Sequence, residues 1–187
     1  EADIRRLERD VRTNEDSKTS KVSRFGGPSI ARLVQLIANS KSKFRHVPVG
    51  PIGMHVNVEN QKWNRAVEFV TKNLLTSFVV DNSADKRILD GLARSCKVPN
   101  GVKSIISKFG RRNEPPVRML PDRSKYTTVA DVIKVDNDQA WNALLDHCSI
   151  ERIVLFDDPA KAERVMKTGR QNVMRAVMED GMIVEIK

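Results

Sequence analysis

The feature that most constrains the fold is an alternation of short apolar segments with amphipathic helical segments, which occurs twice along the chain. The predicted strands are residues 54–58, 77–81, 103–109, 151–156, 173–178 and 182–186. Helical apolar spacing marks the segments between them, for example at 61–75 and 159–168. Strands that alternate with helices are typical of α/β units. The sequence therefore predicts a mixed α/β fold with two small lobes rather than one doubly wound sheet.

A proline-rich segment at residues 110–125 separates the two predicted lobes. It holds three of the eight prolines and has no sustained apolar period, so it predicts a long loop. Near the N-terminus, Ile4, Leu7 and Val11 recur at helical spacing, which predicts the stub of a coiled coil or a surface helix. The predicted organisation is an arm stub with a flexible link over 1–24, lobe I over 25–110, a basic connecting loop over 111–125 and lobe II over 126–187.

Local signals predict several element ends. Asn60 and Asn82 are placed to cap the helices that follow them, with Ser83 as an alternative cap to Asn82. Residues 128–135 predict a strand or a short helix, and 137–147 predict a helix. The dipeptide Asp180-Gly181 predicts a two-residue type I′ hairpin turn.

The chain is basic, and its charge is uneven. The formal net charge is +9, which favours a polyanionic partner. Residues 101–125 hold seven basic and two acidic residues, and residues 25–51 hold four basic residues and no acidic one. Residues 126–158 hold two basic and seven acidic residues. We therefore expect a basic region that attracts phosphate and an acidic part of lobe II that repels it.

The candidate DNA-binding residues are the cations of these basic segments. They are Lys103, Lys108, Arg111, Arg112, Arg118, Arg123 and Lys125, followed by Lys41, Lys43 and Arg45. Phe109 and Tyr126 flank the loop and can stack on bases, and a proline-rich loop offers no helix for a major groove. Single-stranded DNA is therefore expected to bind better than duplex. The alternative is a solvated loop whose charges only keep it soluble.

Composition excludes several other classes of protein. The longest apolar runs are about four residues, too short for a membrane span. Residues 1–20 hold six acids and no apolar core segment, so they are not expected to be a signal peptide, and we expect the chain to be an excised fragment. Two cysteines predict a reducing compartment rather than a disulfide scaffold. His46, His55 and His147 lack metal-ligand spacing, so no metal site and no cofactor are predicted.

Signals of an enzyme are few. The chain contains no G-x-x-x-x-G-K-[ST], G-x-G-x-x-G or G-x-S-x-G pattern. The remaining candidate is Asp157-Asp158, directly after an apolar strand, where paired carboxylates can hold Mg²⁺ for phosphoryl transfer or nuclease chemistry. The alternative is that Asp158 caps a helix that begins at Pro159.

Two stretches resemble a known family. Arg24-Phe25-Gly26 and Gly50-Pro51-Ile52-Gly53, followed by a strand, a helix and Phe78-Val79-Val80, are similar to the start of a structural-maintenance-of-chromosomes (SMC) hinge domain. Residues 153–158, a helix, Gly169, a strand and Asp180-Gly181 resemble the second lobe of that family. The Pro-Val-Gly-Pro-Ile-Gly form most resembles the Smc-six branch.

The resemblance implies a function without catalysis in this part of the protein. It implies a hinge module of two α/β lobes that forms a heterodimer with an Smc-five-type hinge and binds single-stranded DNA, and double-stranded DNA more weakly. It further implies coiled-coil arms, distant ATPase heads, and a place on chromosomes in the nucleus in DNA repair and recombination. The family pattern and open strand edges place the partner contact at Gly169, Val173, Met174, Ala176 and Gly181.

Overall fold

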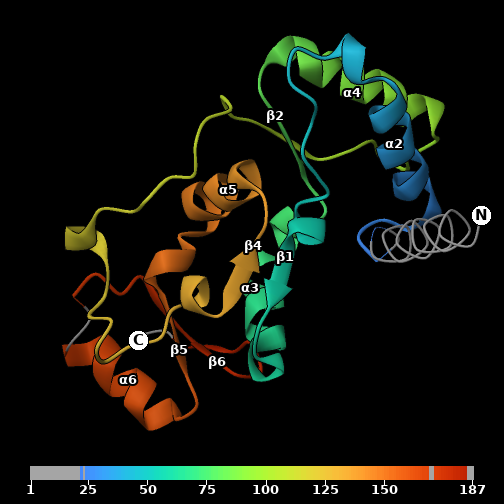
Figure 1. Ribbon diagram of the computed structural model, residues 1–187. Coiled ribbons are helices and arrows are strands. Elements are labelled where there is room, and N and C mark those ends of the chain that lie inside the picture. The colour runs from blue at the N-terminus through green and yellow to red at the C-terminus, as the bar shows by residue number, and fades with distance from the viewer. Residues whose placement is uncertain (1–21, 23, 169–170, 185–187) are drawn as a thin grey trace, which may run out of the picture. The chain divides into compact units, whose positions relative to one another are not determined.

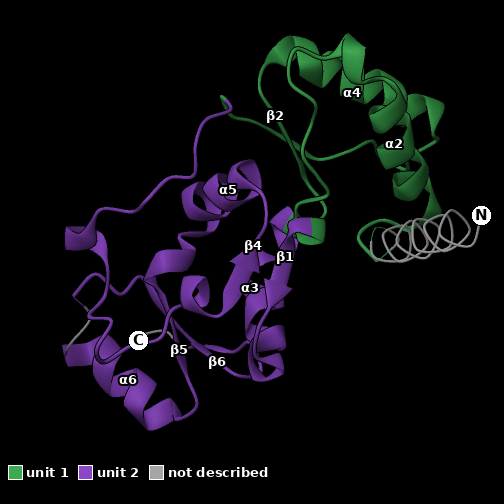
Figure 2. Ribbon diagram, viewed as in Figure 1, with its two compact units in different colours: residues 1–54, 75–108 green, residues 55–74, 109–187 purple. Residues whose placement is uncertain are grey.

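The computed structural model describes residues 22, 24–168 and 171–184, which divide into two compact units (Figure 2). Unit 1 takes the described residues up to Met54 together with Leu75–Lys108, and unit 2 takes His55–Leu74 together with the described residues from Phe109 onward. The helices and short strands of Figure 1 confirm the predicted mixed α/β class. The predicted arm stub over residues 1–12 lies outside the described residues.

One segment differs from the predicted lobes. Residues 55–74, expected in lobe I, belong to unit 2. Strand β1 (Val56–Val58) pairs antiparallel with β4 (Ile133–Val135), with Val56 opposite Val135. This pairing joins segments far apart in the chain, so the chain enters unit 2, returns to unit 1 near Leu75 and leaves it again near Lys108.

Unit 1 contains one strand–helix–strand crossover. Strand β2 (Phe78–Val80) runs parallel to β3 (Ser104–Ile106), and helix α4 (Ser83–Ser95) connects them. Helix α2 (Gly27–Asn39) packs against α4. Short 3-10 helices lie at Lys41–Lys43 and Ile52–His55.

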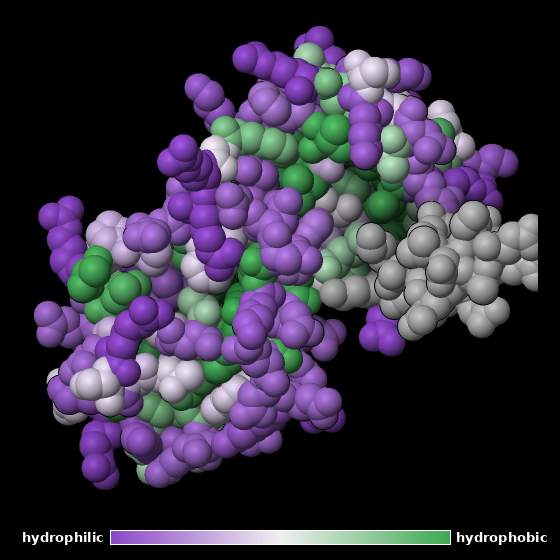
Figure 3. Space-filling view, viewed as in Figure 1, coloured by the Kyte–Doolittle hydropathy of each residue, from purple (hydrophilic) through white to green (hydrophobic). Residues whose placement is uncertain are grey.

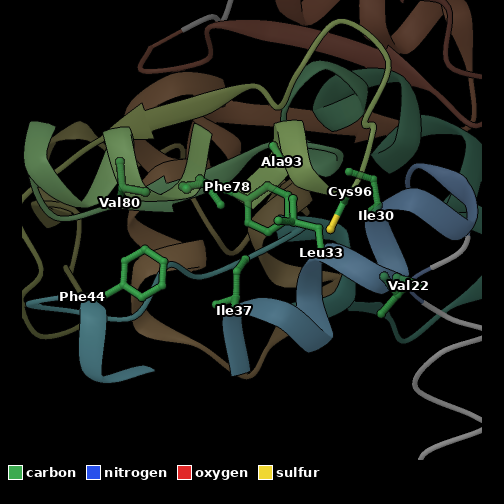
Figure 4. Packing of buried hydrophobic residues seen from close by; sticks show 11 residues of the cluster. Val22, Ile30, Leu33, Ile37, Phe44, Phe78, Val80, Ala93 and Cys96 are labelled. Carbon is green, nitrogen blue, oxygen red and sulfur yellow. The ribbon is translucent and has the colours of Figure 1, made fainter. Parts of the chain in front are cut away.

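The core of unit 1 is aliphatic with two phenylalanines (Figure 4). Leu33 of α2, Phe78 of β2 and Leu89 of α4 are fully buried. The other members of this cluster are Val22, Ile30, Ala31, Ile37, Phe44, Val80, Ala93 and Cys96. Because these residues come from three elements and the loops between them, burial of one apolar face from each holds the unit together.

The two motifs that begin the family resemblance meet in unit 1. A Cβ atom at Gly53 would lie 2.3 Å from Cε1 of Phe25, far inside van der Waals contact. Only glycine leaves room for the ring at that position. The Phe-Gly and Gly-Pro-Ile-Gly motifs are therefore one packing arrangement.

Unit 2 also contains a strand–helix–strand crossover, and a hairpin follows it. Strand β5 (Ile153–Phe156), helix α6 (Pro159–Thr168) and strand β6 (Arg175–Met178) form a parallel unit, and β7 (Ile183–Val184) pairs antiparallel with β6. The sheet order is β5-β6-β7, so β6 is central. Predicted helix 159–168 is confirmed at both ends.

Two further helices complete unit 2. Helix α3 (Asn64–Leu75) follows a 3-10 turn at Gln61–Trp63, and helix α5 is Asp138–Cys148. The remaining 3-10 turns are Val117–Met119, Val129–Asp131 and Ile150–Arg152. Among the described residues, no helix has both the length and the apolarity needed to cross a membrane.

The segment predicted as strand or short helix contains both. Residues Val129–Asp131 form a 3-10 turn and β4 follows it. The Asp131 carboxylate accepts hydrogen bonds from the backbone N–H (2.9 Å) and the hydroxyl (2.7 Å) of Thr128. This capping arrangement starts the turn.

The predicted type I′ turn at Asp180-Gly181 is wrong. Only Gly181 of the pair has a positive φ, of 92°. The Gly181 N–H donates to the carbonyl of Met178 (2.9 Å), and the Met178 N–H donates to the carbonyl of Met182 (2.8 Å). These bonds define a three-residue loop, in which a type I turn is followed by a glycine bulge.

Candidate functional site

The basic connecting loop is fixed on helix α5 at its beginning. The side chain of Gln139 accepts from the Gly110 N–H (3.3 Å) and donates to the Gly110 carbonyl (2.7 Å). The buried side chain of Asn142 donates to the carbonyl of Arg111 (3.0 Å) and accepts from the N–H of Asn113 (2.7 Å). The interpretation of this segment as an irregular loop is correct, and side chains of α5 bind its backbone.

Trp141 of α5 also contacts the loop, and two interactions involve it. Its Nε1–H donates to the Asn113 carbonyl at 3.0 Å. The guanidinium of Arg112 lies over the ring, 3.8 Å from its centre, and donates from Nη1 to the Val135 carbonyl at 2.9 Å. Arg112 therefore holds the loop to the protein, which leaves fewer of its donors for phosphate.

A second attachment lies further along the loop. The Asn172 side chain donates to the carbonyls of Arg118 (2.8 Å) and Leu120 (3.0 Å). Asn172 has a positive φ of 62°, and its own carbonyl accepts from Nε of Arg152 at 3.1 Å. Asn172 thus fixes the 3-10 turn Val117–Met119 on the body of unit 2.

This fixed turn presents both charge and apolar surface. Val117 is 85% exposed and Met119 is 44% exposed, on either side of the exposed Arg118. A small hydrophobic patch lies over this turn at the left of Figure 3, among hydrophilic side chains.

Two of the predicted DNA-binding cations are paired with carboxylates. Lys125 contacts Asp122 at 2.8 Å, and Arg123 contacts Asp131. Hydrogen bonds from Lys125 and Ser124 lower the pKa of Asp122 to about 2, and the same pairing raises the pKa of Lys125. Burial opposes ionisation of Asp131, but the bonds from Thr128 and Arg123 outweigh it and lower its pKa. These carboxylates reduce the local positive charge that a phosphate would meet.

Arg111 and Arg118 of the loop differ from these paired cations. Within the described ranges, the side chains of Arg111 and Arg118 form no ion pair or hydrogen bond. All ten predicted positions are exposed, and they divide evenly between the units. Unit 1 carries Lys41, Lys43, Arg45, Lys103 and Lys108, and unit 2 carries Arg111, Arg112, Arg118, Arg123 and Lys125.

The predicted partner-contact residues are mostly used inside unit 2. Val173 and Ala176 are buried in a core cluster. Gly181 is buried in the hairpin turn, where a Cβ atom would lie 3.1 Å from Cβ of Phe69. Met174 is 45% exposed, and Gly169 lies outside the described residues. Of the four described positions, only Met174 presents an exposed side chain, and the interface stays a prediction.

The carboxylates of Asp157 and Asp158 make contacts of a structural kind. Asp158 Oδ1 accepts from the Ala160 N–H (2.9 Å), which is the capping role. Asp157 lines a groove of about 670 Å³ with Lys62 and Glu179. Nζ of Lys62 lies 3.6 Å from Asp157 and 3.9 Å from Glu179, so an ammonium group already lies where a cation between these carboxylates would bind. This arrangement favours capping over the magnesium alternative.

Sequence reasoning missed one polar cluster in unit 1. His46, Asp81 and Asp85 bring ligand-type atoms within 4.8 Å of one another. Asp85 is buried and accepts from the backbone N–H groups of Arg45 (2.9 Å) and His46 (3.2 Å). The cluster therefore attaches the segment carrying Arg45 to the start of α4. His46 is too far from Asp81 and Asp85 in the sequence for spacing to group the three.

Comparisons with known proteins agree with this architecture. The family described as SMC proteins Flexible Hinge Domain matches residues 45–166. Structural maintenance of chromosomes protein 6 of Schizosaccharomyces pombe is 33% identical over 166 residues, which cover 89% of this chain and 14% of that protein. Protein 6B of Arabidopsis thaliana is 36% identical over 150 residues (79% of this chain, 14% of that protein). The human protein 6 is 30% identical over 184 residues (93% and 16%).

Solved structures give the same result. The S. pombe Smc5/6 hinge domain matches 92% of this chain and 64% of that chain, with a TM-score of 0.74 and 28% identity. The Geobacillus stearothermophilus SMC hinge matches with a TM-score of 0.59 at 12% identity, over 100% of this chain and 77% of that one, which shows the shared fold. This chain spans about one seventh of the length of its curated relatives. On the match over residues 45–166 and the shared architecture, the chain belongs to the SMC hinge family, and it is most similar to the Smc6 branch.

Proposed function

We propose that this chain is the hinge of an Smc6-type subunit and pairs one-to-one with an Smc5-type hinge. The observation that carries this proposal is the likeness to the S. pombe Smc5/6 hinge over 92% of the chain. The whole protein would then be a nuclear, chromosome-associated ATPase subunit of DNA repair, with its ATP-binding heads outside this chain. The hinge itself would be a binding module and not an enzyme.

Strand β7 supports a partner contact near the hairpin. It pairs with β6 on one side and has no second partner among the described strands. An open edge accepts a strand from another chain, and the neighbouring Met182 is 52% exposed. Met174 is also exposed, so a partner has both backbone and side-chain contacts available.

Co-expression with an Smc5-type hinge tests the pairing. We expect one copy of each chain in the complex by mass measurement in solution. The double substitution Met174→Glu and Met182→Glu should weaken the complex, while Arg87→Glu on α4 of unit 1 should leave it intact. A chain that stays monomeric beside its partner at micromolar concentration would contradict the proposed pairing.

We further propose that the basic segments bind DNA, with single strands preferred. Arg111 and Arg118 support this proposal because hydrogen bonds fix the loop backbone. Their guanidinium groups form no ion pair or hydrogen bond with the part of the chain that the structure describes, so they can bind phosphate. Lys103 and Lys108 extend the basic segment on unit 1. Arg112, Arg123 and Lys125 should contribute less, since each has a partner inside unit 2.

The salt dependence of binding tests this assignment. Each phosphate contact on a single strand contributes about 0.7 to the slope of log affinity against log salt. The double variant Arg111→Glu and Arg118→Glu should therefore flatten the slope by about 1.4. Its matched control is Arg87→Glu with Arg164→Glu, which changes the net charge equally at two exposed positions outside the basic segments. Equal losses in both variants would indicate diffuse attraction, and no DNA binding at all would leave a purely structural dimeriser.

A further inference from the structure

A pocket of about 440 Å³ lies on unit 2 between the basic loop and the start of the segment that leads to β6. Its lining includes Arg118, Leu120, Lys125, Tyr126, Gln171 and Asn172. Pockets of small-ligand sites span about 300–1,000 Å³, so this one has room for a single small group and not for a duplex.

The walls of the pocket are held by the protein. Asn172 fixes the loop wall through the carbonyls of Arg118 and Leu120. The half-buried Tyr126 is fixed from behind, since its ring contacts the Phe156 ring edge-on at a centroid distance of 6.3 Å. Its N–H also donates to the Asp122 carbonyl at 3.0 Å. The pocket is therefore formed before any ligand arrives, which reduces the entropy cost of binding.

The lining combines three kinds of group. Tyr126 supplies an aromatic ring, and Arg118 and Lys125 supply positive charge at the rim. Gln171 supplies an amide that can donate or accept, whereas the Asn172 amide already donates to two carbonyls and offers only its oxygen. Asp122 also lines the pocket, paired with Lys125. A bare anion would meet little net charge here, whereas a ligand with an apolar ring and one phosphate would contact both the Tyr126 ring and the cations.

We infer that this pocket receives one unstacked nucleotide of single-stranded DNA, with the base against Tyr126 and its phosphate at Arg118. This inference rests on the proposed DNA binding. It names the place where one base of the strand unstacks from its neighbours. The Gln171 amide would contact the base edge. Because an amide both donates and accepts, such a pocket tolerates all four bases. A paired base cannot enter, which gives a physical reason for a preference for single strands.

Affinity for oligo-dT, measured by fluorescence anisotropy, tests the pocket in the 187-residue chain. Loss of one base–aromatic stack weakens binding by about tenfold, so Tyr126→Leu should show a loss of that order and Tyr126→Phe should not. Gln171→Glu places a carboxylate at an exposed rim position without touching the core, and it should also weaken binding. Phe69→Leu is the matched control, since Phe69 is an exposed aromatic residue of α3 that lies outside the basic segments and does not line the pocket.

Cross-linking locates the base directly. An oligonucleotide with one 5-iododeoxyuridine, irradiated in the complex and mapped by mass spectrometry, should attach to the peptide that contains Tyr126. A folded chain that binds the oligonucleotide equally well in the Tyr126 and Gln171 variants, and cross-links elsewhere, would overturn the pocket and leave DNA binding intact. A folded wild-type chain that binds no oligonucleotide would overturn both.

Discussion

The guanidinium of Arg112 lies 3.8 Å from the centre of the Trp141 ring and turns a residue of the basic loop into a structural contact. A cation over an indole face is stabilising, and the planar guanidinium also donates to the Val135 carbonyl. Its neighbour Arg111 has no such contact within the described residues. Adjacent arginines of the same loop thus have different roles.

Arg112→Ala should therefore lower the free energy of unfolding by about 1–2 kcal/mol, because a ring contact and a hydrogen bond are lost. Arg112→Lys should recover little of this loss, since an ammonium lacks the planar fork. Arg111→Ala should change stability by less than about 0.5 kcal/mol. Chemical denaturation checks all three, and equal losses at the two arginines would contradict the distinction.

Asn142→Leu should release the first part of the loop. The substitution leaves the Asn113 N–H and the Arg111 carbonyl without their partner, at a cost of about 2 kcal/mol. Hydrogen exchange at the Asn113 amide should become faster. Asp146→Asn, at an exposed position one turn along α5, is the control and should leave that amide protected.

Gly181→Val should destabilise unit 2 by more than about 1 kcal/mol, because a β-branched residue is strained at a φ of 92° and would press on Phe69. Glu179→Val introduces the same side chain in the same turn, at an exposed residue without a positive φ. It should stay within about 0.5 kcal/mol of the wild type. Identical melting temperatures for the two variants would disprove the turn assignment.

Cys148 should be unreactive in the folded chain. Burial raises the pKa of its thiol to about 11, although Arg175 opposes the shift. Against the ordinary thiol pKa of 9.0, the thiolate fraction at pH 8 falls by about 100-fold. Alkylation by iodoacetamide at pH 8 should therefore be slow until the chain is denatured. An equal rate in native and denatured samples would contradict the burial.

The raised pKa of Cys148 also predicts how the stability of the fold changes with pH. The folded state holds the proton more tightly than the unfolded state, so this contribution to stability is complete below the unfolded pKa of 9.0. It is lost as pH rises toward about 11. A Cys148→Ala variant should show a smaller fall in stability over that interval.

Local features of the fold could be predicted from the sequence. The caps at Asn60, Asn82 and Asp158 are confirmed, because each depends on residues within one helical turn. The transfer of β1 and α3 to unit 2 was not predicted. A three-residue strand such as Val56–Val58 has no pattern that selects its distant partner β4. The turn at Gly181 was mispredicted because Asp-Gly suits both a type I′ turn and a glycine bulge.

The sequence predicted a cluster of cations but not the contacts that hold the loop. Clustered charge in the sequence identified the cations, all of which are exposed. Apolar periodicity predicted a helix over residues 137–147, and α5 lies there. The same periodicity ignores polar side chains, so it could not show that Gln139 and Asn142 bind the loop. Pairing of Lys125 with Asp122 and Arg123 with Asp131 likewise depends on backbone turns that charge counting does not describe.

The way α5 binds the loop has a consequence for how such a surface can evolve. Gln139, Asn142 and the Trp141 N–H contact only main-chain atoms of Gly110, Arg111 and Asn113. Every amino acid except proline offers the same N–H and carbonyl, so mutations at positions 111 and 113 can alter charge without displacing the backbone. Selection can therefore adjust the affinity of this surface for its ligand one side chain at a time, while the scaffold beneath it stays the same.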